Sequence, residues 1–135
     1  MSIFIASDHA GFKLKEYLCN HFDLVDLGTH SETSCDYPVS AKKLVHNITD
    51  IDQGILVCGS GIGMSIVANR FKHIRAALCF TPEMSVLARQ HNNANVLVLG
   101  ARVISKEIAK DCLEKFMSTR FEGGRHQRRL SLIDL

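Results

Sequence analysis

Five short apolar runs alternate with helix-compatible segments, and this alternation limits the possible folds more than any other feature of the chain. Strands that alternate with helices form right-handed β-α-β crossovers and therefore a parallel sheet covered on both sides. Because the runs are mostly unbroken, we expect every strand to be buried on both faces. The predicted strands are Ile3–Ala6, Leu24–Leu27, Gly54–Cys58, Ala76–Cys79 and Val96–Leu99. The predicted helices are residues 11–22, 38–48, 62–70, 82–91 and 105–118.

This pattern predicts a three-layer α/β/α fold, Rossmann-like (flavodoxin-like), with a five-stranded parallel sheet. The chain of 135 residues is long enough for one such domain and its hydrophobic core. We place the α/β core in residues 1–120. Residues 121–135 are expected to form a basic C-terminal tail, because Glu122-Gly123-Gly124 breaks the last long helix and arginines crowd the positions around it.

Charge, hydropathy and cysteine usage exclude several classes of protein. A formal net charge of +2 is too small to indicate nucleic-acid binding, and no apolar run approaches the roughly 20 residues that span a bilayer. The apolar start is interrupted by Asp8-His9 without a preceding basic region, which argues against a signal peptide. Five cysteines without a C-x-x-C pair favour a reducing cytoplasm over a disulfide framework or a zinc site. We therefore expect a cytoplasmic protein that binds no nucleic acid, membrane or metal.

A glycine-rich loop after the third predicted strand contains the most reactive candidate residue. The sequence there is Cys58-Gly59-Ser60-Gly61-Ile62-Gly63, followed by a helix-compatible segment. In a strand–loop–helix unit the loop amides converge at a helix N-terminus and can hold an anion. The same partial positive charge favours a thiolate over a thiol. A cysteine beside such a loop suits the removal of a proton from carbon next to a carbonyl group.

Other polar residues are expected around the same loop. Ligands of open parallel sheets bind outside the carboxyl ends of the strands. Asp8 and His9 follow the first predicted strand, and Arg102 follows the fifth. His91 and Asn92 close the fourth predicted helix, and we expect them in the same cluster.

The basic tail offers a further binding element. Arg125 and Arg129 are four residues apart, so a helical turn would place them on one side. Two guanidinium groups on one side suit a phosphate or a carboxylate.

Each of these features also has a structural alternative. Cys58 could be a small buried apolar residue, and Asp8 could cap the first helix. The glycines could serve only a tight turn, since the loop has neither the Lys-Ser/Thr of a P-loop nor the G-x-G-x-x-G spacing. The arginines of the tail could form a solvated face.

Five motifs resemble those of the B-type ribose-5-phosphate isomerases, in the order in which that family carries them. The family also contains galactose-6-phosphate isomerase subunits and allose-6-phosphate isomerases. The resemblance runs from Ile3 to the C-terminal tail, and five motifs at matching spacing are far more specific than one. The motifs are Ser7-Asp8-His9-Ala10-Gly11, Asp36-Tyr37-Pro38, Cys58-Gly59-Ser60-Gly61-Ile62-Gly63, Arg89-Gln90-His91-Asn92 and Glu122-Gly123-Gly124-Arg125-His126-Gln127.

The resemblance implies interconversion of D-ribose 5-phosphate and D-ribulose 5-phosphate, in the non-oxidative branch of the pentose phosphate pathway. The reaction would pass through a cis-enediolate and need no metal or organic cofactor. By similarity, Cys58 is the catalytic base and Ser60 is the hydroxyl that activates it. His91 matches the histidine that opens the furanose ring, and Asp8 matches a position near the ring oxygen. Some relatives carry a glutamate base six residues after this cysteine, but Met64 stands there, so the chain resembles the cysteine type.

The resemblance also implies the residues that bind the substrate. The loop amides would stabilise the enediolate oxygen, Tyr37 would line the pocket, and Asn92 would contact substrate hydroxyls. The full set of implied binding residues is Asp8, His9, Tyr37, Gly59, Ser60, Gly61, Ile62, Gly63, Asn92, Arg102, Arg125 and Arg129.

Members of this family are dimers, often paired into tetramers, whose active sites draw residues from two subunits. The resemblance therefore implies a homodimer or homotetramer, with the basic tail reaching a partner subunit. A pentose substrate is favoured because one chain carries the cysteine, histidine and arginine motifs, which galactose-6-phosphate isomerases divide between two subunits. An isomerase of allose or galactose 6-phosphate is the alternative.

Two alternatives of other classes also stay open. A non-catalytic phosphate- or FMN-binding module could use the glycine loop, although the chain has no tryptophan and only Tyr17 and Tyr37 to sandwich a flavin. A redox protein could use Cys58 as a reactive thiol, although no resolving cysteine lies within the motif.

Overall fold

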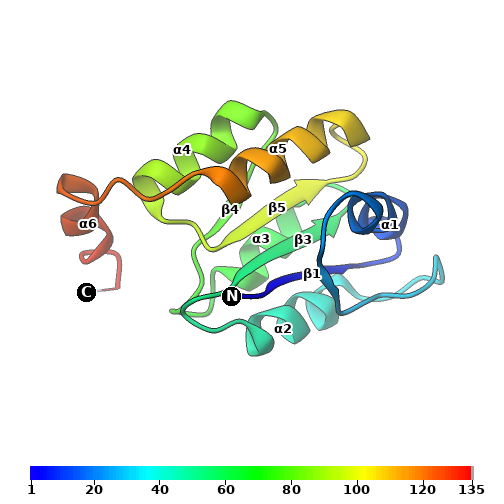
Figure 1. The fold of residues 1–135 in the computed structure, drawn as a ribbon. Helices are drawn as coiled ribbons and strands as arrows, with labels where there is room; N and C mark the ends of the chain where they lie inside the picture. The colour runs from blue at the N-terminus through cyan, green and yellow to red at the C-terminus, as the bar shows by residue number, and fades with distance from the viewer. Residues whose placement is uncertain (135) are drawn as a thin grey trace.

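The five apolar runs form one parallel sheet (Figure 1). In this computed structural model, which describes residues 1–134, the strand order is β2-β1-β3-β5-β4. Every pairing is parallel, so the carboxyl ends of all five strands lie at one edge. The predicted α/β fold with a five-stranded parallel sheet is confirmed. The strands are β1 (Ile3–Ser7), β2 (Val25–Asp26), β3 (Gln53–Cys58), β4 (Ala76–Leu78) and β5 (Val96–Gly100).

Burial differs between the centre and the edges of the sheet. All residues of β3 and β5 are buried, as their unbroken apolar sequences predict. The expectation of burial for every strand is wrong at the two edges, where β2 and β4 contain no buried residue. An edge strand has a neighbouring strand on only one side, so its side chains gain less cover.

The helices begin and end close to the predicted residues. Pro38 and Pro82 lie in the first turns of α2 and α4, where no intrahelical bond needs the missing N–H. α3 ends two residues earlier than predicted, because the Asn69 side chain exchanges two hydrogen bonds with the Ala76 backbone. The helices are α1 (Phe12–His21), α2 (Tyr37–Asn47), α3 (Ile62–Ala68), α4 (Pro82–Asn92), α5 (Lys106–Ser118) and α6 (Arg125–Leu130).

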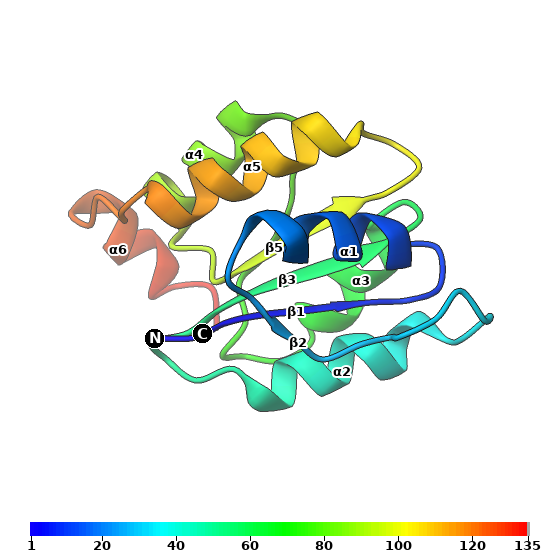
Figure 2. The same cartoon turned by 45° about the vertical axis from the view of Figure 1, so that its right-hand side comes forward.

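Two layers of helices cover the sheet (Figure 2). α1, α4 and α5 pack on one face through residues that include Leu113 and Phe116. α2 and α3 pack on the other face through residues that include Leu44 and Met64. Because side chains alternate along a strand, Cys58 at the end of β3 belongs to the α2–α3 face.

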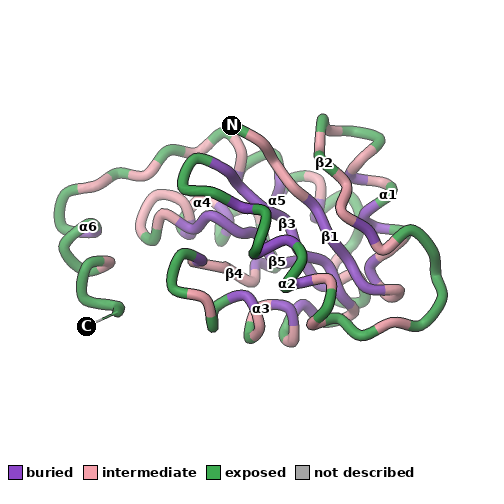
Figure 3. The backbone as a smooth tube through the Cα atoms, turned by 90° about the horizontal axis from the view of Figure 1, so that it is seen from below, coloured by how far each residue is buried: buried purple, intermediate pink, exposed green. Residues whose placement is uncertain are grey.

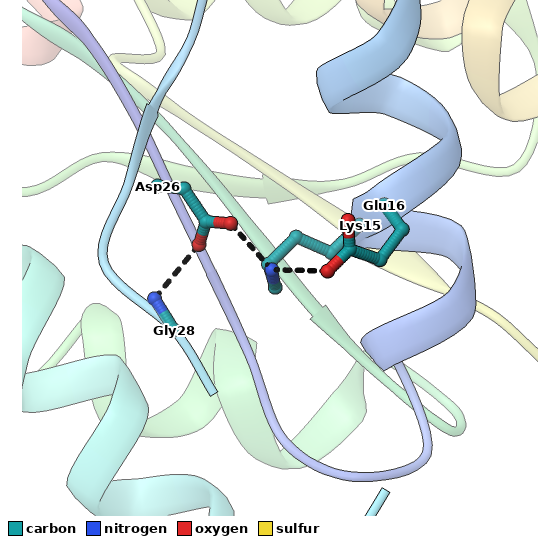
Figure 4. A network of polar contacts seen from close by, with 4 residues as sticks. All are labelled: Lys15, Glu16, Asp26 and Gly28. Carbon is teal, nitrogen blue, oxygen red and sulfur yellow. Dashed lines mark hydrogen bonds and ion pairs between the residues drawn. The ribbon is translucent and has the colours of Figure 1, made fainter. Parts of the chain in front are cut away.

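A buried lysine ties α1 to β2 and to the loop that follows β2 (Figure 4). The Lys15 side chain is fully buried, and its Nζ donates to Asp26 Oδ2 at 2.7 Å. The other oxygen of Asp26 accepts the Gly28 N–H at 2.8 Å. Burial by itself raises the pKa of Asp26, but the hydrogen bonds from Lys15 and Gly28 outweigh this effect and hold the pKa below its ordinary value. The network anchors the start of the loop of residues 28–36.

The C-terminal tail lies at the edge where the strands begin, at the left of Figure 1. Its helix α6 is mostly exposed, as the tube in Figure 3 shows. The buried residue of this helix is His126. The division into a core of residues 1–120 and a tail of residues 121–135 stays a prediction, and position 135 lies outside the described residues. None of the helices in residues 1–134 has the length and apolar character needed to cross a membrane.

Candidate active site

A cavity opens where the sheet topology changes direction. α1 and α3 leave the neighbouring strands β1 and β3 for opposite faces of the sheet, which is where open α/β sheets bind ligands. The cavity has a volume of about 610 Å³, and its walls come from the loops after β1, β3 and β5 and from helices α2 and α3. Its lining residues are Asp8, His9, Ala10, Tyr37, Cys58, Gly59, Ser60, Ile62, Gly63, Ile66, Arg102 and Val103.

Cys58 is nearly buried and lines this cavity. The Gly61 N–H donates to its Sγ at 3.1 Å, and α3 begins at Ile62, beside the sulfur. A thiolate accepts such an N–H more strongly than a thiol does, and a helix N-terminus favours negative charge. Among the buried cysteines of the core, burial raises the pKa of Cys79 to about 11 and also raises that of Cys112. The surroundings of Cys58 therefore suit a base.

The glycine loop keeps two amide groups free beside the cysteine. Gly61 has a φ of +80°, and a Cβ there would lie 2.5 Å from Leu78 Cδ1, so the turn requires glycine. The Ser60 Oγ accepts the Ile62 N–H at 3.2 Å, and within residues 1–134 no hydrogen bond joins Ser60 to Cys58. Activation of Cys58 by Ser60 stays a prediction. In the same part of the chain the N–H groups of Gly59 and Ser60 form no hydrogen bond, which leaves them available to an oxyanion.

Asp8 and His9 follow β1 and reach the cavity from its other side. One oxygen of Asp8 accepts the Gly11 N–H at 3.0 Å, which closes the turn before α1. The cap residue of α1 is Gly11, and within residues 1–134 no side chain caps this helix, so the structural alternative of Asp8 as the helix cap is wrong. His9 Nδ1 accepts the Cys35 N–H at 3.1 Å. A ring nitrogen that accepts an N–H carries no proton, so neutral His9 holds its proton on Nε2 and can donate it in a hydrogen bond to a substrate.

Tyr37 and Arg102 approach the loop because two glycines leave space for them. A Cβ on Gly63 would overlap the Tyr37 ring, and a Cβ on Gly59 would lie 3.1 Å from Arg102 Nη1. The tyrosine and the arginine are both exposed and both line the cavity. They add a phenol and a positive charge beside Cys58.

His91 and Asn92 lie at the opposite edge of the sheet from Cys58. α4 starts at the carboxyl end of β4 and runs back across the sheet, so its last residues lie where the strands begin. With 11 residues the helix carries the chain about 16 Å. The expectation that His91 and Asn92 join the Cys58 cluster within one chain is therefore wrong.

A second cavity, of about 370 Å³, lies beside His91. α6 supplies much of its wall, including Arg129, whereas Arg125 is exposed and does not line it. The predicted anion-binding residues are thus divided, with Arg102 at the first cavity and Arg129 at the second. The lining residues are His91, Asn92, His126, Arg129, Leu130 and Ile133.

Glu122 and His126 lie beside His91, and no role was predicted for either residue from the sequence. The His91 and His126 rings stack with their centroids 4.3 Å apart, and Glu122 Oε1 lies 3.4 Å from His126 Nε2 and 3.9 Å from His91 Nε2. Burial lowers the pKa of His126, and the charges of His91 and Arg125 add to this effect against the carboxylate of Glu122. Sequence spacing gave no signal for this pair, because α6 begins at Arg125 and Glu122 precedes the helix.

Comparisons with known proteins place the chain among sugar isomerases. Residues 3–133 match the family model described as Ribose/Galactose Isomerase. The chain is 41% identical to ribose-5-phosphate isomerase B of Escherichia coli (strain K12), over 93% of this chain and 89% of that protein. The structure of a ribose 5-phosphate isomerase from Thermotoga maritima matches with a TM-score of 0.94 and 54% identity, over 98% of this chain and 97% of that one. Ribose-5-phosphate isomerase B from Mycoplasma genitalium, solved with bound ribulose-5-phosphate, matches with a TM-score of 0.89 and 42% identity, over 98% and 93%.

Proposed function

Because the chain belongs to the ribose/galactose isomerase family, we propose that it interconverts D-ribose 5-phosphate and D-ribulose 5-phosphate with Cys58 as the base. The coarser assignment, an isomerase of sugar phosphates, follows from relatives named ribose-5-phosphate isomerase B. The relative with bound ribulose-5-phosphate, at 42% identity, supports the pentose substrate. The main support for Cys58 as the base is its position in a cavity, with free loop amides beside its sulfur.

The proposed chemistry moves one proton between two neighbouring carbons. In the open-chain aldose, the Cys58 thiolate takes the proton from C2, and the C1 carbonyl oxygen becomes the enediolate oxyanion. The hydroxyl proton passes from O2 to O1, the thiol returns its proton to C1, and C2 becomes the carbonyl carbon. An ordinary thiol is only a few per cent ionised at pH 7, so the Gly61 N–H and the start of α3 would assist the base.

The free amides of Gly59 and Ser60 are the proposed donors to the enediolate. A donor that is already oriented toward the developing charge contributes about 3 kcal/mol in a site that excludes water. The Nε2–H of His9 and the guanidinium of Arg102 would bind other oxygens of the substrate from the same cavity. Binding of the non-reacting phosphate would hold C1 and C2 against the sulfur.

Ring opening by His91 requires a second copy of the chain, because His91 and Cys58 lie at opposite edges of one sheet. A groove of about 790 Å³ borders the His91 cavity and shares Asn92, Leu130 and Ile133 with it. At the first cavity, the apolar residues Ile62 and Ile66 of α3 are exposed beside Cys58. We infer that α3 of a second copy enters this groove, which would complete two sites by two-fold symmetry. His91, Asn92 and the tail arginines Arg125 and Arg129 would then meet the substrate of the partner.

The test is isomerisation of ribose 5-phosphate in a buffer that contains a chelator, with wild type, Cys58→Ala and Cys19→Ala compared. Cys19 is a half-buried cysteine outside both cavities and serves as the control. Loss of a proton-transfer group should lower the rate by about 10²- to 10⁴-fold in Cys58→Ala, with sugar-phosphate binding retained. Cys19→Ala should keep its rate. Near-normal turnover by Cys58→Ala would show that another group is the base.

Allose 6-phosphate and galactose 6-phosphate belong in the same assay, since the family includes isomerases of six-carbon sugars. Turnover of one of these, without turnover of ribose 5-phosphate, would agree with the proposed mechanism but show that the substrate is a six-carbon sugar phosphate.

A further inference from the structure

Three metal-ligating side chains gather beside the second cavity, and the proposed reaction does not require all of them. The ligand atoms of His91, Glu122 and His126 all lie within 4.8 Å of one another, the one such group in residues 1–134. Two imidazoles and a carboxylate form a ligand set that Zn²⁺ takes in proteins, whereas Mg²⁺ prefers oxygen ligands.

The state of His126 is an independent sign of a ligand. Its side chain is only 8% exposed, and within residues 1–134 its Nε2 has no hydrogen-bond partner, although the Glu122 carboxylate lies 3.4 Å away. A buried polar nitrogen without a protein partner is rare, and a bound ion is one of the few arrangements that explain it. The Nε2 of a neutral imidazole offers a lone pair that can bind a cation.

We propose that His91, Glu122 and His126 bind one transition-metal ion, represented here by Zn²⁺, and that the bound ion inhibits the isomerase. Three protein ligands leave a fourth tetrahedral position for water, and the cavity beside His91 provides the space for it. Metal–ligand distances of about 2.0–2.2 Å require the ligand atoms to be about 3.3 Å apart. His91 must therefore turn out of its stack on His126.

The exposures of the three side chains permit this movement. The side chains of His91 and Glu122 are 40% and 49% exposed, whereas His126 is held in the wall of the cavity. Arg125 and Arg129 oppose a cation, and the Glu122 carboxylate offsets only part of their charge. We therefore expect a reversible site, emptied by a chelator, and not a permanent structural metal.

Inhibition follows from the role of His91, and this part of the inference rests on the proposed function. A ring nitrogen that binds a metal can neither accept nor deliver a proton at the sugar ring oxygen. Metal binding itself does not depend on the reaction, so the two statements can be tested separately.

The binding test is calorimetric titration of metal-free protein with Zn²⁺, and with Mg²⁺ for comparison. Wild type, Cys58→Ala and the exposed-histidine control His21→Gln should each bind one Zn²⁺ per chain and no Mg²⁺. His126→Gln and Glu122→Gln should bind Zn²⁺ at least about tenfold more weakly, since loss of a direct ligand costs no less than loss of an outer-shell partner. Glu122 is exposed, so its variant keeps the result interpretable if His126→Gln folds poorly.

The activity test compares each variant with its own metal-free rate. Zn²⁺ should inhibit wild type, a chelator should restore the rate, and Glu122→Gln should need at least about tenfold more Zn²⁺ for the same inhibition. Absence of Zn²⁺ binding in wild type, equal binding by all variants, or loss of binding in Cys58→Ala alone would overturn the metal site. Intact Zn²⁺ binding with no turnover of any sugar phosphate would instead overturn the proposed function.

Discussion

Backbone N–H groups set the states of the two most reactive side chains in the first cavity. Gly61 donates to Cys58 Sγ, and Cys35 donates to His9 Nδ1. The Cys35 contact requires an unprotonated Nδ1, so it exists only while the His9 ring is neutral. The Cys35 contact depends in turn on the loop of residues 28–36, whose start is held by Asp26 and the buried Lys15. A residue far from the cavity thus helps to orient His9.

Asp26→Asn should therefore destabilise the fold more at neutral pH than at acid pH. At pH 7 the substitution removes the ion pair of Lys15 with Asp26 and leaves only the exposed Glu16 carboxylate, 3.7 Å from Lys15 Nζ, so we expect the free energy of unfolding to fall by about 3 kcal/mol. Because the folded-state pKa of Asp26 lies below its ordinary value, the carboxylate stabilises the fold above the unfolded-state pKa. This contribution is lost as pH falls through the folded-state pKa.

Urea denaturation at pH 7 and at pH 3 measures this effect, with the exposed Asp23→Asn as the control. The difference between wild type and Asp26→Asn should shrink below about pH 4, near the ordinary pKa of aspartate. A difference that does not change with pH would contradict the role of the Asp26 carboxylate.

At the scale of elements, the geometry of the second cavity depends on the linker between α5 and α6. Arg89 near the end of α4 donates from Nε to the Thr119 carbonyl at 3.1 Å and from Nη1 to the Ala94 carbonyl at 2.6 Å. Its guanidinium also lies over the Phe116 ring, 5.7 Å from the centroid. The Glu122 N–H donates to the Gln90 carbonyl at 3.1 Å. These contacts hold the linker against α4 and bring Glu122 and His126 to His91.

Arg89→Lys should loosen this linker although it keeps the positive charge. Lysine lacks the planar guanidinium group with its several N–H donors, so it cannot donate to the Thr119 and Ala94 carbonyls at the same time. We expect the Glu122 amide to exchange its hydrogen at least about tenfold faster, as loss of about 1.4 kcal/mol implies. Hydrogen exchange measures this, with the exposed Arg70→Lys as the control. Unchanged protection of Glu122 would show that other contacts hold the linker.

At the scale of the whole molecule, the two cavities of one chain face opposite edges of the sheet. A substrate that contacts both Cys58 and His91 therefore requires two chains. One chain would supply Cys58 to the site and the other chain would supply His91. The exposed apolar residues of α3 and the groove beside α6 are the surfaces that would meet. If the proposed arrangement holds, activity depends on the assembly of two chains.

Two inactive variants should consequently restore activity to each other. Random pairing of Cys58→Ala and His91→Ala chains makes half of the dimers mixed, and each mixed dimer contains one site with both residues intact. We expect about a quarter of the wild-type activity after the two variants are unfolded together and refolded. Each variant refolded alone provides the control. No recovery in the mixture, with mixed dimers demonstrated by mass spectrometry, would show that the sites are not shared.

Much of this molecule is determined by residues that are close together in the sequence. The apolar runs determined the buried strands β3 and β5, and the alternation with helices determined the parallel sheet. The loop after β3 determined the neighbourhood of Cys58, because a strand end, a glycine turn and a helix start are local features. The cavity residues Asp8, His9 and Arg102 were predictable for the same reason, since each follows a strand at the carboxyl edge, whereas Tyr37 was expected from the family resemblance alone.

Only the tertiary structure decided the strand order, the exposure of the edge strands and the place of His91. Sequence periodicity reports which face of an element is buried, but not the direction in which a helix returns along the sheet. The return of α4 carries His91 to the far edge, and the linker held by Arg89 then brings Glu122 and His126 to it. These three side chains meet through contacts between segments about 30 residues apart, for which the local pattern contains no signal.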